Sequence, residues 1–266
     1  IIFLRFLIYN YMKTRLIILG CGSSVGVPRI DGYWGNCKKS KKNHRTRCSA
    51  LIQKGRNNIL IDTSPDLRQQ FLSNKIKNIN SVLYTHEHAD QTHGIHELRP
   101  FFWKNKNKIN IYGNLRTINI LKRRFEYCFK SSNGYSAMLN PNIINKKFNL
   151  GENNEKIRFQ TVDLQHGQII SVGYIFEKTA YLSDCNNFSE QVLKQLKGLK
   201  YLIIDCLRIE KHPSHLNLNE AIEISQFLKP KKTILTNLHH DLDYNYLLKN
   251  LPTNVIPAYD GLKLIL

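Results

Sequence analysis

Two histidines and an aspartate alternate with other residues in the segment Thr85-His86-Glu87-His88-Ala89-Asp90. The apolar run at residues 81–85 is typical of a buried strand, so these side chains leave a strand end on a loop. Two imidazoles at this spacing can bind one metal ion, and the carboxylate can orient a bound water or hold a second ion. A chain of this composition would contain the pattern by chance about 0.01 times. The segment therefore predicts a metal centre rather than a set of solvated loop histidines.

Other side chains that can bind metals follow further apolar runs along the chain. They are His166, Asp184, His212, His215, His239 and His240. Each of them alone is more often an ordinary surface residue or a hydrogen-bonded core residue. Because a rigid sheet holds the loops at its strand ends, we expect several of these side chains to converge on the ion bound by the His86 segment.

Short apolar runs rich in Ile, Val, Leu and Tyr predict strands. These runs are residues 15–20, 49–53, 58–62, 81–85, 108–112, 157–162, 169–176, 180–183, 201–205, 233–236 and 255–258. Apolar residues spaced three or four positions apart predict helices. These segments are residues 66–73, 114–130, 187–196, 219–228 and 241–248. The alternation of strands and helices predicts a fold of mixed α/β layers.

No repeat or low-complexity linker divides the chain, which predicts a single domain over residues 12–266. Residues 1–11 are too short to span a bilayer and lack the small-residue cleavage site of a signal peptide. Because Met12 directly precedes the first predicted strand, we expect residues 1–11 to be a non-native or disordered extension. No other segment reaches transmembrane length, so no membrane partner is expected. The six cysteines include no Cys-x-x-Cys pair, which favours a reducing, cytoplasmic location.

The chain carries a formal net charge of +19, which favours anionic partners such as phosphate esters or nucleic acid. Lys, Asn and Ile are abundant throughout, however, which indicates a general composition bias. The densest basic run, residues 38–47, lies in one predicted loop and contains no Phe, Trp or Tyr. Charge alone therefore leaves nucleic-acid binding open but does not favour it.

The motifs of the chain resemble those of the metallo-β-lactamase superfamily over residues 12–266. Within that superfamily the chain looks closest to the phosphoribosyl cyclic phosphate phosphodiesterases, and above all to a less characterised bacterial branch of that group. The segments that carry the resemblance are residues 19–29, 33–37, 45–49, 62–68, 86–99 and 212–216. The resemblance implies an αββα sandwich, in which two mixed β-sheets are flanked by helices.

The resemblance also implies roles for individual residues. The histidines that correspond to the first metal site are His86, His88 and His166. Asp184 corresponds to the carboxylate that bridges two ions, and Asp90 to the aspartate of the second site, which would orient the attacking hydroxide. His215 corresponds to a general acid or substrate ligand. Asp62 corresponds to a buried strand-end residue that supports the site through hydrogen bonds.

Two positions depart from the pattern of the superfamily, and both lie in the second metal site. Gln91 stands where a histidine usually follows the motif aspartate, and Asn237 stands where a histidine usually ends a strand near the C-terminus. Amide oxygens are harder and weaker donors for Zn²⁺ than imidazole nitrogens. We therefore expect one Zn²⁺ at the first site, and a second site that is absent, weak or occupied by a harder ion such as Mn²⁺. His239 could supply the missing imidazole.

These observations predict a metal-dependent hydrolase, specifically a phosphodiesterase that attacks a small phosphodiester, cyclic ones included, with a metal-bound hydroxide. The expected partner is therefore a small anionic substrate, and the chain could form a homodimer. An RNA-processing endonuclease of the same superfamily is one alternative; the charge favours it, and the lack of a long inserted arm opposes it. A non-catalytic module that binds metal or nucleic acid is the other. Retention of Asp90, Asp184 and His215 argues against this loss of activity.

Overall fold

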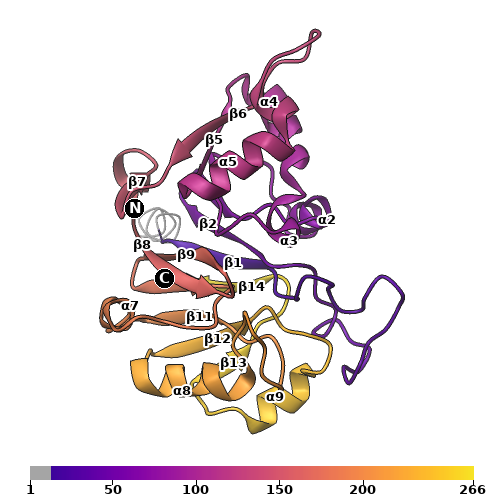
Figure 1. Cartoon of the computed structure of the whole chain (residues 1–266), viewed down its shortest axis with the longest axis vertical. Helices are drawn as coiled ribbons and strands as arrows, with labels where there is room; N and C mark the ends of the chain where they lie inside the picture. The colour runs from indigo at the N-terminus through magenta and orange to yellow at the C-terminus, as the bar shows by residue number, and fades with distance from the viewer. Residues whose placement is uncertain (1–12) are drawn as a thin grey trace, which may run out of the picture.

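Two mixed β-sheets lie face to face at the centre of the fold, and helices cover their outer faces (Figure 1). The computed structural model describes residues 13–266. The extension expected at residues 1–11 lies outside the described residues. The architecture is an αββα sandwich of two mixed sheets with flanking helices, which confirms the predicted fold class.

Seven strands form the first sheet, in the order β14-β1-β2-β3-β4-β5-β6. They are β1 (Arg15–Gly20), β2 (Ser49–Lys54), β3 (Asn57–Ile61), β4 (Ser81–Leu83), β5 (Ile109–Gly113), β6 (Leu139–Ile143) and β14 (Leu262–Ile265). Strands β14, β1, β2 and β3 pair antiparallel, whereas β3, β4, β5 and β6 run parallel. The parallel half therefore brings the segments that follow β3 and β4 to one edge, where ligands bind in sheets of this kind.

Seven further strands form the second sheet, in the order β13-β12-β11-β10-β9-β8-β7. They are β7 (Lys147–Leu150), β8 (Ile157–His166), β9 (Ile169–Phe176), β10 (Thr179–Leu182), β11 (Tyr201–Asp205), β12 (Lys232–Thr236) and β13 (Val255–Pro257). Strands β10 to β13 run parallel. Asp184, Asp205 and Asn237 therefore end or follow neighbouring strands at one edge of this sheet.

Helices cover the outer face of each sheet (Figure 1). Those on the first sheet are α2 (Leu67–Ser73), α3 (Ala89–Thr92), α4 (Arg99–Asn105), α5 (Leu115–Arg124), α6 (Glu126–Phe129) and the 3-10 helix Ile95–Leu98. Those on the second sheet are α7 (Glu190–Gln195), α8 (Leu218–Leu228) and α9 (Tyr244–Asn250). A 3-10 turn, Asn153–Glu155, joins β7 to β8. Within residues 13–266, no helix combines the length and the apolar character needed to cross a membrane.

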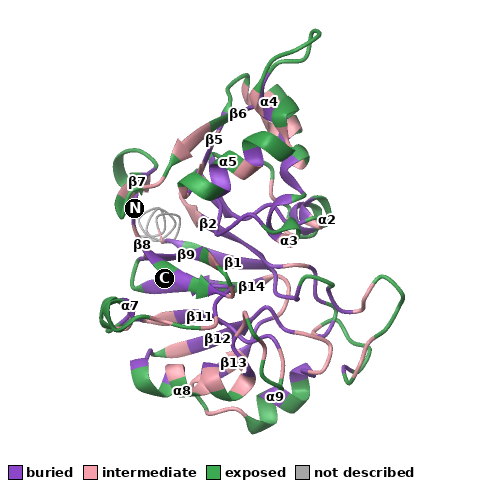
Figure 2. Ribbon diagram, viewed as in Figure 1, coloured by how far each residue is buried: buried purple, intermediate pink, exposed green. Residues whose placement is uncertain are grey.

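The alternation of side chains along β1 shows how the layers pack. Leu16 and Ile18 point into the core between the sheets, which also contains Phe159 and Tyr174 of the second sheet. Ile17 and Leu19 point to the other face and pack beneath the helices of the first sheet. Figure 2 shows the central strands buried and the outer helix faces exposed. Burial on both faces explains why such strands form continuous apolar runs in the sequence.

The sequence does not predict the strands β6, β7 and β14 or the helix α4. Both β6 and β7 lie at a sheet edge, and their sequences, Leu-Asn-Pro-Asn-Ile and Lys-Phe-Asn-Leu, contain residues that form strands poorly. An edge strand tolerates Pro141 because some of its backbone groups have no neighbouring strand to bond. The helix predicted at residues 114–130 is divided at Phe125, whose φ of −123° is not helical.

A buried arginine holds the long loop between β1 and β2. The Arg45 side chain is 1% exposed. Its guanidinium donates to the carbonyl oxygens of His239 at 3.1 Å and Leu242 at 2.7 Å, and to Asn43 Oδ1 at 3.1 Å. One guanidinium nitrogen also lies 3.8 Å from Cys37 Sγ. Charge-assisted hydrogen bonds therefore tie this loop to the segment that follows β12.

Replacing Arg45 by Met should lower the free energy of unfolding by about 2–4 kcal/mol, because several buried acceptors would lose their donors. Urea denaturation of the two proteins measures the difference. Arg123 is exposed and provides the control, since Arg123→Met should change the stability by less than about 0.5 kcal/mol. Equal stabilities of the two variants would contradict the role assigned to Arg45.

Candidate metal centre

Three imidazoles from two sheets meet at the carboxyl ends of their strands. His86 and His88 follow β4, and His166 ends β8 in the facing sheet. Nε2 of His86 lies 3.0 Å from Nδ1 of His88, and Nε2 of His166 lies 3.3 Å from the same nitrogen. Nitrogens bound at about 2.0–2.1 Å to a tetrahedral ion lie about 3.3 Å from one another. The spacing of the three nitrogens therefore fits a single ion.

Hydrogen bonds fix the outer nitrogen of two of these rings. Nδ1 of His86 lies 3.0 Å from Thr85 Oγ1, which donates to Asp62 Oδ2 at 2.8 Å. Nδ1 of His166 donates to the carbonyl oxygen of Ser214 at 2.7 Å. Each Nδ1 thus carries the proton, and each Nε2 presents a lone pair to the other rings. The Nε2 lone pairs of His86 and His166 both face Nδ1 of His88, so this donor set fits a divalent metal ion.

Burial also keeps the histidines of this cluster in the form that binds metals. It lowers the pKa of His86 to about 3. It also lowers the pKa of His88, with the His166 ring contributing in the same direction. Both imidazoles are therefore neutral at physiological pH and have a lone pair available to an ion.

Two residues at strand ends adopt a left-handed backbone. Asp62 follows β3 with a φ of 60°, and Asn237 follows β12 with a φ of 62°. Both oxygens of Asp62 accept from Thr85, one from its backbone N–H and one from its hydroxyl, each at 2.8 Å. Asp62 therefore reaches His86 through Thr85, in the supporting position expected from the sequence. Backbone strain of this kind concentrates at functional sites.

Amide groups surround the carboxylates on the other side of the centre. Gln91 Nε2 donates to Asp90 Oδ2 at 3.2 Å and to Asp184 Oδ2 at 3.4 Å. Asn237 Nδ2 donates to Asp184 Oδ1 at 3.3 Å and to the carbonyl oxygen of Ser183 at 3.1 Å. The N–H groups of the two amides therefore point to Asp184 and Asp90 on the side where a second ion would bind.

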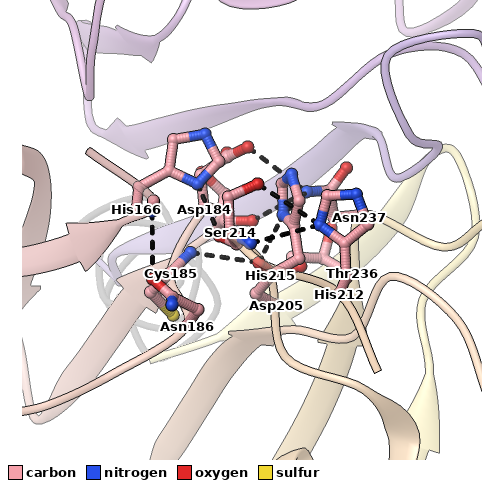
Figure 3. Close-up of polar contacts among 12 residues, drawn as sticks. His166, Asp184, Cys185, Asn186, Asp205, His212, Ser214, His215, Thr236 and Asn237 are labelled. Atoms are coloured by element: carbon pink, nitrogen blue, oxygen red, sulfur yellow. Dashed lines mark hydrogen bonds and ion pairs between the residues drawn. The ribbon is translucent and has the colours of Figure 1, made fainter. Parts of the chain in front are cut away.

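His215 faces the same centre and forms an ion pair with Asp205 (Figure 3). Its Nδ1 lies 2.7 Å from Asp205 Oδ2, which also accepts from the Cys185 N–H at 3.0 Å. Because Asp205 engages Nδ1, Nε2 is the free ring nitrogen. His215, His166 and Asp184 each present one potential ligand atom, and these three atoms lie within 4.8 Å of one another. His215 could therefore act on a substrate held at the centre or join its ligands.

The two partners of this ion pair shift each other's protonation. Burial opposes the charge on His215, but the Asp205 carboxylate raises its pKa overall to about 9. Burial raises the pKa of Asp205 to about 6, although His215 opposes the change. The pair is therefore ionised at neutral pH. Asp205 is a functional residue that the sequence-based prediction missed, although it carries the same signal as Asp184, a carboxylate at a strand end.

His239, which could replace the missing imidazole of the second site, forms other contacts in the structure. Its Nδ1 lies 3.1 Å from Asp241 Oδ1, and its ring packs on that of His240 with centroids 3.6 Å apart. The backbone N–H of His239 donates to the carbonyl oxygen of Leu207 at 2.9 Å. Among residues 13–266, neither His239 nor His240 belongs to a group of three metal-binding side chains. The turn after Asn237 thus directs His239 toward its own acidic partner.

The model of the beta-lactamase superfamily domain matches residues 57–239, a range that contains the whole imidazole cluster. The chain belongs to this superfamily. A solved structure described as a new diphosphatase from the PhnP family is 32% identical to this chain. Its TM-score is 0.86, and the alignment covers 95% of this chain and 97% of the other. The predicted resemblance to metallo-β-lactamase-fold hydrolases is therefore confirmed.

Two solved structures of lower sequence identity share the fold of this chain. Zn²⁺-bound PqqB from Methylobacterium extorquens is 17% identical, with a TM-score of 0.73 over 95% of this chain and 100% of that one. The short form of human tRNase Z is also 17% identical, with a TM-score of 0.67 over 94% of this chain and 98% of that one. At these identities the likeness concerns the fold alone.

A curated relative from Porphyromonas gingivalis, named octanoyltransferase, is 32% identical over 263 residues. The match covers 95% of this chain but 51% of the relative. This chain therefore spans about half the length of that relative. The activity in the relative's name belongs to the longer protein.

Proposed function

We propose that the chain is a metal-dependent phosphodiesterase that hydrolyses a small phosphoric diester. Three imidazole nitrogens that meet beside buried carboxylates and an ionised His–Asp pair support this proposal. The residues that would hold the ion are His86, His88, His166 and Asp184. Zn²⁺ is the expected metal, because neutral imidazoles suit zinc. A bound divalent ion would supply positive charge that polarises a phosphoryl group and lowers the pKa of water.

Two residues would move protons during hydrolysis. Burial and the neighbouring Asp184 raise the pKa of Asp90 to about 6, so its carboxylate can accept a proton from the attacking water near neutral pH. His215 carries a proton at neutral pH and can donate it from Nε2 to the leaving oxygen, while Asp205 holds Nδ1. The bond from phosphorus to the leaving oxygen would then break with the departing alcohol neutral.

We also propose that the centre works with one ion. Gln91 and Asn237 donate N–H groups to Asp184, and Gln91 donates to Asp90 as well. Hydrogen bonds to an ionised carboxylate stabilise it without an added cation. A second ion would have to displace these donors and accept amide oxygens in place of imidazoles.

Metal analysis by mass spectrometry of the purified protein should therefore find one divalent ion per chain. The double variant Gln91→His with Asn237→His should bind a second ion, because it restores two imidazoles beside Asp184. The single variants provide intermediate controls for the two positions. Two tightly bound ions in the unmodified protein would show that the amides do not weaken the second site.

The proposed substrate class is supported by the activity that one relative's description gives. The PhnP-family structure at 32% identity is described as a diphosphatase, which supports hydrolysis of a bond to phosphorus. A diphosphate bond is therefore the second candidate for the scissile bond. Octanoyl transfer does not enter the proposal, because the match covers only 51% of the relative that is named for it.

A substrate screen with metal-analysed protein tests the proposal. The panel contains bis(p-nitrophenyl) phosphate, a five-membered cyclic ribose phosphate, a cyclic nucleotide, a diphosphate diester and a short RNA, each with and without chelator. Chelator-sensitive hydrolysis of a small diester is the expected result. Cleavage of the RNA without hydrolysis of the small diesters would favour the endonuclease, and inactivity toward the whole panel would favour a binding module.

A further inference from the structure

A basic cavity of about 800 Å³ lies outside the metal centre. Its walls come from the loop that precedes β2, from helix α2 and from the residues around the start of β14. Four lysines line it, namely Lys39, Lys41, Lys42 and Lys263. None of the lining residues belongs to the two groups of metal-binding side chains found within residues 13–266. The proposed hydrolysis therefore leaves this cavity without a role.

The fold places aromatic rings beside the basic run of residues 38–47, which has none of its own. Trp34 and Tyr259 line the cavity. Nζ of Lys42 lies 3.2 Å from the ring centroid of Tyr259 and 4.8 Å from that of Tyr244. These cation–π contacts hold one ammonium group at the cavity wall. The loop that carries this lysine is itself anchored by buried Arg45.

The one carboxylate that lines the cavity does not neutralise the lysines. Asp260 accepts from the Thr46 N–H at 2.8 Å, from its hydroxyl at 2.6 Å and from the Cys21 N–H at 3.1 Å. The ion pairs of residues 13–266 involve none of the four lysines. An anion in the cavity would therefore meet ammonium groups that no carboxylate engages.

A buried side chain fixes one wall of the cavity. Gln70 of helix α2 is 2% exposed, and its Nε2 donates to Thr46 Oγ1 and to the carbonyl oxygen of Arg47, each at 2.9 Å. These hydrogen bonds tie helix α2 to the loop that precedes β2, so the two sides of the cavity are held together.

We propose that this cavity is a second binding site, and that its ligand is a nucleoside polyphosphate. Lys39, Lys41 and Lys263 bind the phosphates, and the base packs against Trp34, as bases do on aromatic side chains. The site binds its ligand without reacting with it, and it does not depend on the function proposed for the metal centre.

The chain contains two tryptophans, so Trp103→Phe leaves Trp34 as the single indole. Fluorescence of this variant is titrated in chelator with ATP, with inorganic triphosphate and with adenosine. We expect saturable quenching by ATP, with inorganic triphosphate binding about tenfold more weakly because it lacks the stacked base. Adenosine, which lacks the phosphates, should not saturate the signal. Triphosphate binding as tight as ATP binding would overturn the assignment of a nucleotide.

Two triple variants separate the cavity from the general positive charge of the protein. One replaces Lys39, Lys41 and Lys263 by Ala in the Trp103→Phe background. The matched control replaces three exposed lysines on the first-sheet helices and the adjoining segments, namely Lys106, Lys122 and Lys130. The cavity variant should weaken ATP binding about tenfold or more, and the control should leave it unchanged.

Chelator-sensitive hydrolysis of bis(p-nitrophenyl) phosphate should be the same in both triple variants, since neither alters the metal centre. Absence of saturable quenching by ATP, or equal weakening in the two triple variants, would overturn the proposal. A protein that binds ATP as expected but hydrolyses no diester would contradict only the proposed phosphodiesterase activity.

Discussion

Replacing His86 by Ala should remove the bound metal and lower the rate of hydrolysis by about 10³-fold or more. The imidazole of His86 is one of three nitrogens that would hold the ion, and a hydrogen-bonded chain through Thr85 to Asp62 fixes its position. Loss of the ion removes several kcal/mol of transition-state stabilisation, and each 1.36 kcal/mol is worth about tenfold in rate. Metal content and the rate on bis(p-nitrophenyl) phosphate are measured on the same samples.

His96→Ala is the matched control for this experiment, because the His96 side chain is 57% exposed and contacts only the neighbouring Glu97 among the ion pairs of residues 13–266. This variant should keep both its metal and its activity. Urea denaturation of the metal-free proteins distinguishes a lost ligand from a lost fold. Full activity in a metal-free His86→Ala protein would refute the proposed role of the centre.

Replacing His215 by Ala should lower the rate by about 10²–10⁴-fold on a substrate with a poor leaving group, as expected for loss of a general acid. The effect should be much smaller with bis(p-nitrophenyl) phosphate, because p-nitrophenolate departs without protonation. Comparison of an alkyl ester with a nitrophenyl ester therefore distinguishes proton donation from a structural role. Equal losses on both esters would instead indicate that His215 is a ligand of the ion.

The pH dependence gives an independent test of the His215–Asp205 pair. Because Asp205 raises the pKa of His215 to about 9, the proton donor is present below that pH and is lost as the pH rises through it. The rate on the alkyl ester should therefore fall above about pH 9. Asp205→Asn removes the charge that raises the pKa, so the fall should move to lower pH. An unchanged profile in this variant would exclude Asp205 as the residue that positions the proton.

The sequence predicts that the candidate metal ligands converge, because the signals for these positions are local. His86 and His88 share one loop, and His166 and Asp184 each stand at the end of an apolar run. These are features of short segments, and the sheets bring the segments together. The directions of the side chains are not local. His215 pairs with Asp205 across a loop, and the amide hydrogens of Gln91 point to carboxylates that the sequence cannot place.

Other differences from the sequence-based expectations have similar causes. His239 carries an imidazole and lies just after strand β12, as a ligand of the second site would, but its ring hydrogen-bonds to Asp241 instead. The basic run at residues 38–47 has no aromatic residue within it, yet the fold brings Tyr259 from the far end of the chain to Lys42. Both outcomes depend on contacts between segments that are distant in sequence or on the turn between them, and residue type alone does not predict them.

The left-handed backbone at Asn237 limits which residues evolution can place there. Asn, Asp and His are enriched in this conformation, whereas bulky or branched side chains are strained. An exchange between His and Asn at this position therefore costs little in backbone energy, although it would exchange a potential metal ligand for a hydrogen-bond donor. Lineages of this superfamily could gain or lose an ion by such an exchange while the fold stays intact. The number of ions would then be a property that drifts faster than the architecture that holds them.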